Sequence, residues 1–401
     1  MSRRPRVYYF GMITTDAYGR AVGERIYSGA ATRKMLLVTA ALRSVGHLAA
    51  VVSLPFVGTK AARAGYRGIL QTEQGVPVAF LPTLRSKYFR KVVGPLVLAC
   101  FAARRVRRGD TVILYNHAIE LLPALAILRL KGRSVVHDIE DAPNPETRGI
   151  RRLMSRVSFF AIFRFTRSRK MVVSEEVARL LDLDDYVVVR GVARFPDADT
   201  RPMGAARWEE LRGGGDLRLH FGGSLVAANG VDLFCEAIAL LAESEDRMSR
   251  PVTFTITGVG DMDKIRDAAT RIQGRGKLKV EILPELSVDE FVEAISHCHG
   301  ALSLRRPGAG NADTTFPSKV IEITAAGMAL VSTRLGDVAE IYDRSAYFLD
   351  DYSPRALAEI IVAMSGDTDG VARVAEDGFR TAKRHFSLVN VGNQMTRLFQ
   401  E

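Results

Sequence analysis

Short apolar runs alternate with longer segments of helical periodicity along the whole chain. Such runs are typical of buried strands, and apolar residues spaced three or four apart are typical of helices. In the first half, the pattern predicts strands at Val7–Gly11, Leu48–Leu54, Val76–Leu81, Thr111–Tyr115, Ser134–His137, Met171–Ser174 and Tyr186–Arg190. It predicts helices at Gly29–Val45, Leu96–Val106 and Leu121–Leu130. This alternation favours a parallel, doubly wound α/β sheet.

The second half repeats the same alternation. It predicts strands at Leu217–Phe221, Thr253–Thr257, Leu278–Ile282, Ala301–Leu304 and Met328–Thr333. Helices are expected at Gly230–Leu241, Met262–Ile272, Val288–Ser296 and Leu388–Leu398, and a turn at Gly222–Leu225. A segment rich in Pro and Gly, Arg194–Gly215, separates the halves. We therefore expect a first domain at 1–195, a linker at 196–215 and a second domain at 216–384, with a helix at 385–401 packing back on the first domain.

Length and composition agree with two folded domains. The chain has 401 residues, which exceeds the roughly 250–300 at which single cores stop growing. Its three cysteines lie far apart in the sequence, which implies no disulfide framework and favours a reducing cytoplasm. The apolar stretches Val92–Ala103 and Leu121–Leu130 are too short to span a bilayer, and the run after the basic N-terminus is too short for a signal peptide.

Positive charge is concentrated in the first half. Residues 1–200 hold 33 Lys and Arg against 16 Asp and Glu, a net charge of +17, whereas the remainder carries −6. Such asymmetry suggests that the first domain faces an anionic partner, which could be a membrane surface, a nucleic acid or an anionic lipid-linked substrate.

Two segments carry much of this charge. Arg148–Lys170 holds eight basic residues, no acidic ones and four phenylalanines, and Arg85–Arg108 is similarly basic. A helix with aromatic residues flanked by arginines can lie in a membrane interface, so we expect both segments to meet an anionic membrane surface. Alternatively, the phenylalanines pack inward and the arginines only solvate the helix. No recognised nucleic-acid motif accompanies the charge, so no nucleic-acid partner is expected.

The segment Thr314–Gly336, TTFPSKVIEITAAGMALVSTRLG, predicts a loop that turns into a helix. Pro317 suits the first helical turn, and the Ser318 side chain can serve the exposed N–H groups there. A helix start can bind phosphate, and Glu322, one turn in, can accept hydrogen bonds from ribose hydroxyls. The segment therefore indicates a sugar-nucleotide site, and the alternative is an ordinary helix with a solvated Glu322.

Acidic residues follow a strand of the first half. Asp138, Glu140 and Asp141 come at its carboxyl end, the edge that faces the ligand crevice in open α/β sheets. They could bind acceptor hydroxyls or accept a proton, or they could form a solvated turn. Gly29, at a helix start, could let the backbone approach a phosphate, or could simply permit a tight turn.

Other chemistries are disfavoured. His297, Cys298 and His299 are consecutive and lack the spacing of metal motifs, so no metal or other cofactor is expected. Gly258–Gly260 lacks the third glycine of a dinucleotide fingerprint, which weighs against a dehydrogenase.

Several motifs together resemble one family. They are Gly29–Ala30 with Ala40–Leu42 and Gly46–His47; Val172–Ser174; Gly222–Leu225 with Gly230–Asp232; Gly258–Gly260; Thr314–Gly327; and Phe386–Ser387 with Gln394 and Leu398. With these motifs in this order, the sequence resembles the retaining family-four (group 1) type of GT-B glycosyltransferase. The resemblance implies two Rossmann-like doubly wound domains facing a central cleft. It also implies sugar transfer from a nucleotide-diphospho-sugar with retention of configuration and without a metal.

The resemblance assigns roles to single positions. Glu322 matches the glutamate that binds the donor ribose, whereas the family's first glutamate falls on Thr314. The family's basic pair, which grips the diphosphate, falls on the uncharged Ser224 and Asn229. Lys319, Arg305 and the Thr315–Ser318 backbone are the candidates to replace it.

His117 falls where the family has a histidine near the donor sugar, although it could be a structural histidine at a strand end. We therefore expect catalytic roles for His117, Lys319 and Asp138, and acceptor contacts from Glu140 and Asp141. The expected donor-binding residues are Gly29, Gly223, Ser224, Gly258, Gly260, Arg305, Thr314, Thr315, Phe316, Pro317, Ser318 and Glu322.

The basic, apolar first domain suggests a lipid-linked sugar or polysaccharide acceptor, and a cytoplasmic enzyme on the inner face of the cell membrane. Two alternatives stay open. The uncharged residues at Thr314, Ser224 and Asn229 could mark a non-catalytic partner subunit, and a soluble transferase with a small-molecule acceptor would need no membrane.

Overall fold

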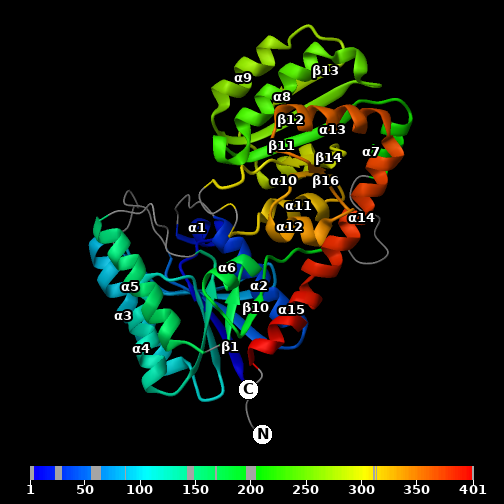
Figure 1. Cartoon of the computed structure of the whole chain (residues 1–401). Coiled ribbons are helices and arrows are strands. Elements are labelled where there is room, and N and C mark those ends of the chain that lie inside the picture. Colours follow the sequence, from blue (N-terminus) through cyan, green and yellow to red (C-terminus); the bar gives the residue numbers. More distant parts are fainter. Residues whose placement is uncertain are drawn as a thin grey trace. The chain divides into compact units, whose positions relative to one another are not determined.

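A computed structural model describes residues 4–22, 29–55, 65–85, 87–141, 149–167, 169–195, 205–309, 312 and 314–399. The chain forms two compact units (Figure 1). Unit 1 comprises Met1–Val192 and Phe386–Glu401, and unit 2 comprises Ala193–His385. Each unit is built on a mainly parallel sheet with helices, which confirms the expected doubly wound α/β class.

The large sheet of unit 1 has the order β10-β9-β8-β7-β1-β2-β5-β4. Its strands are β1 (Arg6–Gly11), β2 (Leu48–Ser53), β4 (Ile69–Glu73), β5 (Val76–Phe80), β7 (Thr111–Tyr115), β8 (Ser134–Ile139), β9 (Lys170–Val172) and β10 (Tyr186–Val188). The pairings are parallel, except that β4 runs antiparallel to β5. A separate pair joins β3 (Gly65–Tyr66) to β6 (Thr83–Leu84). The strand order reverses between β1 and β7, where open α/β sheets bind ligands.

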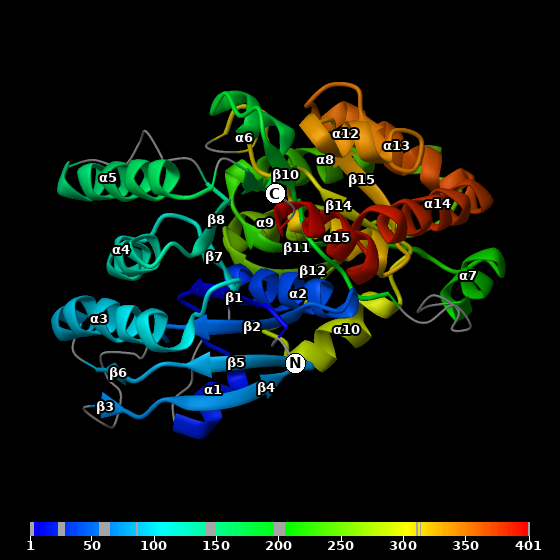
Figure 2. The ribbon, with the colours of Figure 1, turned by 90° about the horizontal axis from the view of Figure 1, so that it is seen from below.

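The helices of unit 1 are α1 (Asp16–Val22), α2 (Ala30–Ser44), α3 (Lys87–Arg105), α4 (Leu122–Leu130), α5 (Gly149–Phe165), α6 (Glu175–Leu180) and α15 (Leu388–Thr396), with short 3₁₀ turns η1 (Ile119–Leu121) and η4 (Arg397–Phe399). Helices α3, α4 and α5 lie side by side in one layer (Figure 2). Helix α3 begins well before the expected Leu96 and contains Pro95 in its interior.

Helix α15 brings the end of the chain back to unit 1. Val391, Met395 and Leu398 are buried in the same hydrophobic core as the residues of α2. The two helices come close because Gly392 has no side chain: a β-carbon there would lie 2.2 Å from the Ala41 carbonyl oxygen. The carboxyl-terminal segment thus completes the core of unit 1.

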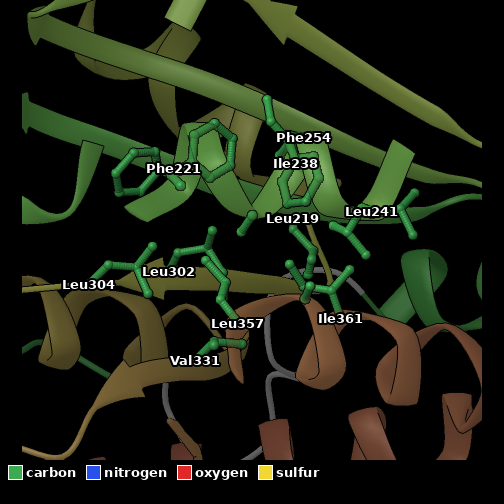
Figure 3. Close-up of a cluster of buried hydrophobic side chains, with 14 of the residues drawn as sticks. Leu219, Phe221, Ile238, Leu241, Phe254, Leu302, Leu304, Val331, Leu357 and Ile361 are labelled. Carbon is green, nitrogen blue, oxygen red and sulfur yellow. The ribbon is translucent and has the colours of Figure 1, made fainter. Parts of the chain in front are cut away.

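Unit 2 contains a six-stranded parallel sheet of order β13-β12-β11-β14-β15-β16. The strands are β11 (Leu217–Leu225), β12 (Val252–Gly260), β13 (Leu278–Ile282), β14 (Gly300–Ser303), β15 (Ala329–Thr333) and β16 (Tyr347–Leu349). This is the order of a dinucleotide-binding sheet, with its reversal between β11 and β14. Aliphatic and aromatic residues of strands and helices meet in one core (Figure 3).

The helices of unit 2 are α7 (Ala205–Arg212), α8 (Val231–Glu243), α9 (Met262–Arg271), α10 (Val288–Ser296), α11 (Ser318–Ala325), α12 (Gly336–Tyr342), α13 (Pro354–Gly366) and α14 (Thr368–Phe386), with 3₁₀ turns η2 (Ala227–Asn229) and η3 (Glu245–Arg247). The last residue of α14 already belongs to unit 1.

The expected linker at 196–215 is partly wrong. Residues 196–204 lie outside the described residues, but 205–212 form α7, which packs in unit 2. The guanidinium of Arg207 is buried and donates hydrogen bonds to the carbonyl oxygens of Ser296 and Ala326, at 3.3 and 3.1 Å. An arginine anchored in this way holds α7 against the domain.

The expected turn at Gly222–Leu225 is also wrong, because β11 continues through it in parallel register with β12. Gly258 and Gly260 have φ angles of +122° and +140°, which side chains rarely tolerate. A β-carbon on these glycines would lie 2.0 Å from the Gly223 oxygen and 2.1 Å from the Leu225 oxygen. These glycines therefore allow two strands to extend where a turn was expected.

Candidate functional site

The candidate site of unit 2 lies beside the strand-order reversal at β11 and β14. Gly223 has a φ of +99°, and a β-carbon there would come within 2.5 Å of Lys319 Nζ. The Lys319 ammonium thus lies over the bare backbone of β11. This brings together a predicted catalytic residue, Lys319, and a predicted donor-binding residue, Gly223, that stand far apart in the sequence.

Lys319 lies in the first turn of α11. Burial lowers its pKa, and the carboxylate of Glu322, one turn later, opposes that shift. The Glu322 side chain is exposed. The helix therefore presents a half-buried cation and an exposed carboxylate from one short segment.

The start of α11 differs from the expectation in detail. Pro317 is the N-cap, with extended backbone (φ −73°, ψ 105°), and not a residue of the first turn. Ser318 is the first helical residue and is exposed, so it does not occupy the capping position.

The loop before α11 is tied to Arg305. The Arg305 guanidinium donates a hydrogen bond to Thr315 Oγ1 at 2.7 Å, and Thr333 Oγ1 donates to the Arg305 carbonyl oxygen at 2.7 Å. Phe316 is buried, whereas Thr314 is half-buried. Arg305 thus orients the loop that leads to Lys319. Residues 310, 311 and 313 lie outside the described residues.

Ser224 and Asn229 are joined by a hydrogen bond. The Asn229 amide donates to the Ser224 carbonyl oxygen at 2.7 Å. These two uncharged residues are thus tied together in the backbone beyond Gly223.

Sequence reasoning missed His220, which lies on β11 just before Gly222. A β-carbon on Gly222 would lie 2.6 Å from His220 Nε2, and this nitrogen is 2.8 Å from Thr257 Oγ1. Burial, and then the nearby Lys319, lower the pKa of His220 to about 4. The ring is therefore neutral at physiological pH. The signal in the sequence was a histidine two positions before a Gly-Gly pair near a strand end.

In unit 1, His117 follows β7 at the corresponding reversal of strand order. Its Nδ1 lies 2.7 Å from Asn116 Oδ1 and its Nε2 lies 3.0 Å from Ser155 Oγ. Burial lowers the pKa of His117, and the Asp141 charge opposes this shift. The ring is held in a fixed orientation by two polar neighbours.

A pocket of about 430 Å³ opens at His117. It is bounded by Gly11 at the end of β1 and by residues of α3, η1 and α5. Its polar lining residues are Lys91, Tyr115, Asn116, His117, Glu120, Ser155 and Ser158. Ser155 and Ser158 were not predicted as site residues. Their spacing of three on a helix places them on one face but does not indicate what that face contacts.

The expected catalytic role of Asp138 disagrees with its position. Its carboxylate is fully buried, bonded to the Tyr9 hydroxyl and 3.5 Å from Lys34 Nζ. Burial raises the pKa of Asp138, whereas Lys34 and Tyr9 oppose the rise. Asp138 does not line the pocket at His117, and its partners are Tyr9 and Lys34 at the strand end.

The two expected acceptor carboxylates have different partners. Glu140 pairs with Lys34, a residue of α2 whose pKa is lowered by burial. Asp141 accepts a hydrogen bond from the Asn116 amide at 3.3 Å, which links it to His117. Of the two, Asp141 is connected to the pocket.

Gly29 precedes α2 in extended conformation (φ −82°), and a β-carbon there would meet no atom within 4 Å. Its local geometry therefore does not require glycine.

Within the described residues, no cluster of three or more His, Cys, Asp or Glu side chains could hold a metal ion. Among the described helices, none is both long and apolar enough to cross a bilayer.

Comparisons with known proteins agree with this architecture. Residues 216–367 match the model of the family described as Glycosyl transferases group 1. A search of curated protein sequences found no significant match.

Solved structures similar over nearly the whole chain include three glycosyltransferases of low sequence identity. HepE from Anabaena, in complex with UDP, is 15% identical with a TM-score of 0.64, and 98% of each chain is covered. A glycosyltransferase from Rickettsia africae is 12% identical with a TM-score of 0.66, covering 99% of this chain and 98% of that one. The α,α-trehalose 6-phosphate synthase from Burkholderia multivorans is 15% identical with a TM-score of 0.63, covering 99% and 96%.

The resemblance noted in the sequence is thus confirmed: unit 2 matches the group 1 glycosyl transferases, and the chain has the fold of GT-B glycosyltransferases, with two Rossmann-like domains.

Proposed function

We propose that this protein transfers a sugar from a nucleotide-diphospho-sugar to a lipid-linked sugar or polysaccharide, with retention of anomeric configuration. The observation that carries the donor site is the Lys319 ammonium held over Gly223, beside the reversal of strand order in unit 2. Anionic ligands bind at such reversals because strand ends and helix starts converge there.

Departure of a nucleoside diphosphate leaves negative charge on its terminal phosphate. A fixed cation in a poorly solvated site stabilises such charge more strongly than a solvated one. Lys319 is half-buried and lies in the first turn of α11, and burial lowers its pKa. We assign it the role of the family's basic pair, which is absent at Ser224 and Asn229. The charge that it supplies is our reason for proposing a reaction without a metal.

Glu322 is the proposed ribose ligand, because its exposed carboxylate stands one helical turn from Lys319. HepE has been crystallised with UDP and with UDP-glucose. UDP conjugates are therefore the first donors to test here.

In unit 1, the pocket at His117 is the proposed sugar-binding region. A neutral, oriented imidazole can exchange hydrogen bonds with a sugar hydroxyl, and Asn116 extends this polar surface to Asp141. The apolar side chains of Met12 and Met154 line the same pocket. A mixed lining of this kind suits a pyranose ring, which has polar edges and apolar faces.

The experiment that tests the donor site is a thermal-shift screen with UDP, GDP, ADP, TDP and their common sugar conjugates. A ligand that binds the native state raises the melting temperature by mass action. We expect one nucleotide to stabilise the wild type more than the Glu322→Ala variant at the same concentration. Equal stabilisation of both proteins would overturn the ribose assignment.

The uncharged Thr314, Ser224 and Asn229 favour one alternative, a non-catalytic partner subunit. A nucleotide shift followed by transfer of labelled sugar to membrane lipid or glycan excludes that alternative. The absence of a shift with every nucleotide would favour it. We further propose that the protein acts in the cytoplasm.

A further inference from the structure

We propose that the outer face of α5 docks on the surface of a bilayer that contains anionic lipids. This outer face comprises Arg152, Leu153, Arg156, Val157 and Phe160. The inference extends the expectation from the basic sequence segments by naming the helix face, and the docking itself does not depend on catalysis.

The outer face is apolar where a surface helix is ordinarily polar. Leu153, Val157 and Phe160 are 63%, 51% and 58% exposed. Their spacing of four and three residues places them on one side of the helix. The opposite side carries the buried Ser158, Phe159 and Ile162. Helix α5 therefore has a core-facing side and a second apolar side that nothing in the described part of the unit covers.

The apolar residues surround a hollow and are bordered by arginines. A surface hollow of about 720 Å³ is lined by Gly149, Arg152, Leu153, Arg156, Val157 and Phe160. Side chains of this kind insert between lipid head groups, while the arginine heads stay at the level of the phosphates.

The positive charge of α5 indicates which partner covers its outer face. Helix α5 contains no acidic residue, so a symmetric contact with a second copy would place arginines against arginines. An anionic bilayer complements both properties, because its phosphates oppose the arginines and its acyl chains accept the apolar side chains.

Helix α3 repeats the pattern within the same helical layer (Figure 2). Its Val92 and Leu96 are 63% and 57% exposed, one turn apart, and the helix ends in the exposed Arg104 and Arg105. The layer thus offers a second apolar and basic helix to the same kind of surface.

The opposite side of α5 forms part of the pocket at His117, through Met154, Ser155 and Ser158. A helix with its side chains is about 10 Å across. A docked α5 would therefore hold the pocket about one helix diameter from the head groups, within reach of a short glycan whose lipid anchor remains in the bilayer. This last step rests on the proposed function.

Vesicle flotation tests the docking. Wild-type protein is mixed with vesicles of phosphatidylcholine alone, or of phosphatidylcholine with phosphatidylglycerol, at low and high salt. We expect flotation with the anionic vesicles at low salt, and weaker flotation at high salt. The Leu153→Ser/Val157→Ser/Phe160→Ser variant should partition at least about tenfold less. Arg152→Ser/Arg156→Ser should float less and show a weaker salt dependence than the wild type.

Arg67→Ser/Leu70→Ser is a matched control variant. Arg67 is exposed just before β4, and Leu70 is 78% exposed within β4. This variant should float like the wild type. The proposal is overturned if wild-type protein ignores anionic vesicles, or if the triple variant binds them as well as the control does. It is also overturned if size-exclusion chromatography shows a dimer that only the triple variant dissociates.

The nucleotide thermal shift, measured on the same preparations, separates the two hypotheses. A retained shift without vesicle binding overturns the docking alone. Vesicle binding without any nucleotide shift leaves the docking standing and counts against the donor site.

Discussion

Lys319 Nζ occupies the space where a side chain on Gly223 would begin, since a β-carbon there would come within 2.5 Å of the ammonium. The two residues are 96 positions apart and come from a strand and a helix start. Their contact explains why a glycine with a φ of +99° stands at this position: it leaves room for the cation above the backbone.

Gly223→Ala should weaken nucleotide binding while the protein still folds. The new methyl group displaces the Lys319 ammonium, and the positive φ adds about 1–2 kcal/mol of backbone strain. Gly274→Ala is the control, because Gly274 has a φ of +87° but no atom within 4 Å of a β-carbon. Calorimetry with the nucleotide identified by thermal shift measures the affinity of both variants. Equal affinities would refute the proposed role of the Lys319–Gly223 contact in nucleotide binding.

Lys319→Met should slow sugar transfer by about 10²–10³-fold and weaken nucleotide binding much less. The physical reason is that the charge on the leaving diphosphate is greatest in the transition state. Single-turnover kinetics at saturating donor measure the effect. Lys279→Met, which removes an exposed lysine of the same unit, should behave as wild type. A loss confined to KM would mean that Lys319 only binds the donor.

Glu322→Ala should weaken nucleotide affinity by about tenfold to a hundredfold, the range of a lost hydrogen bond to a charged group. Glu340→Ala, another exposed carboxylate of unit 2, is its control. Deoxyribonucleotide binding offers a second readout, because a ligand without the 2′-hydroxyl should discriminate less between wild type and Glu322→Ala.

Lys34→Met should destabilise the protein by about 3–5 kcal/mol, because it leaves Asp138 buried without its cation. Adding Asp138→Asn should restore part of this loss, since the amide carries no charge. Urea denaturation of both single variants and the double variant checks the coupling. Strict additivity of the two losses would show that the pair does not interact.

Acid should destabilise unit 1 through His137. Burial lowers the pKa of this histidine to about 3, against about 6.5 in an unfolded chain. Between these values the unfolded state binds the extra proton, so stability is complete above about pH 6.5 and is lost as the pH falls. Between about pH 7.5 and 5, His137 should lower the free energy of unfolding by about 2 kcal/mol.

His137→Gln should remove that contribution and flatten the pH profile, because glutamine can still donate to the Asn116 carbonyl oxygen that accepts from His137 Nε2 in the folded protein. Chemical denaturation of both proteins across this pH range measures the difference. Parallel pH profiles would contradict the assignment.

Much of the fold could be predicted from local sequence. Strand β7 ends where it was expected, at Tyr115, because Asn116 takes a φ of +54° that ends the strand. Strand β4 was missed, because it forms the sheet edge and exposes Leu70, so it lacks a continuous apolar run. The Gly222–Leu225 segment continues a strand where its glycines predicted a turn, because glycines permit either a turn or the close approach of two strands.

The candidate site was less predictable, because its contacts join distant segments. Asp138 at a strand end was expected to face a ligand, but Lys34, 104 positions away, buries it. Lys319 and Glu322 could be named from their helix, whereas the position of Lys319 over Gly223 depends on the packing of α11 on the sheet. Ser155 could not be recognised as a site residue from the sequence, because its contact with His117 depends on where α5 packs.

The return of α15 to unit 1 also sets an order of events during synthesis. Val391, Met395 and Leu398 belong to the core of unit 1, yet they leave the ribosome only after the whole of unit 2. Unit 2 has its whole chain available once His385 has emerged. The unit that is translated first therefore finishes its core last, and until then it exposes the apolar surface of α2 to chaperones and proteases.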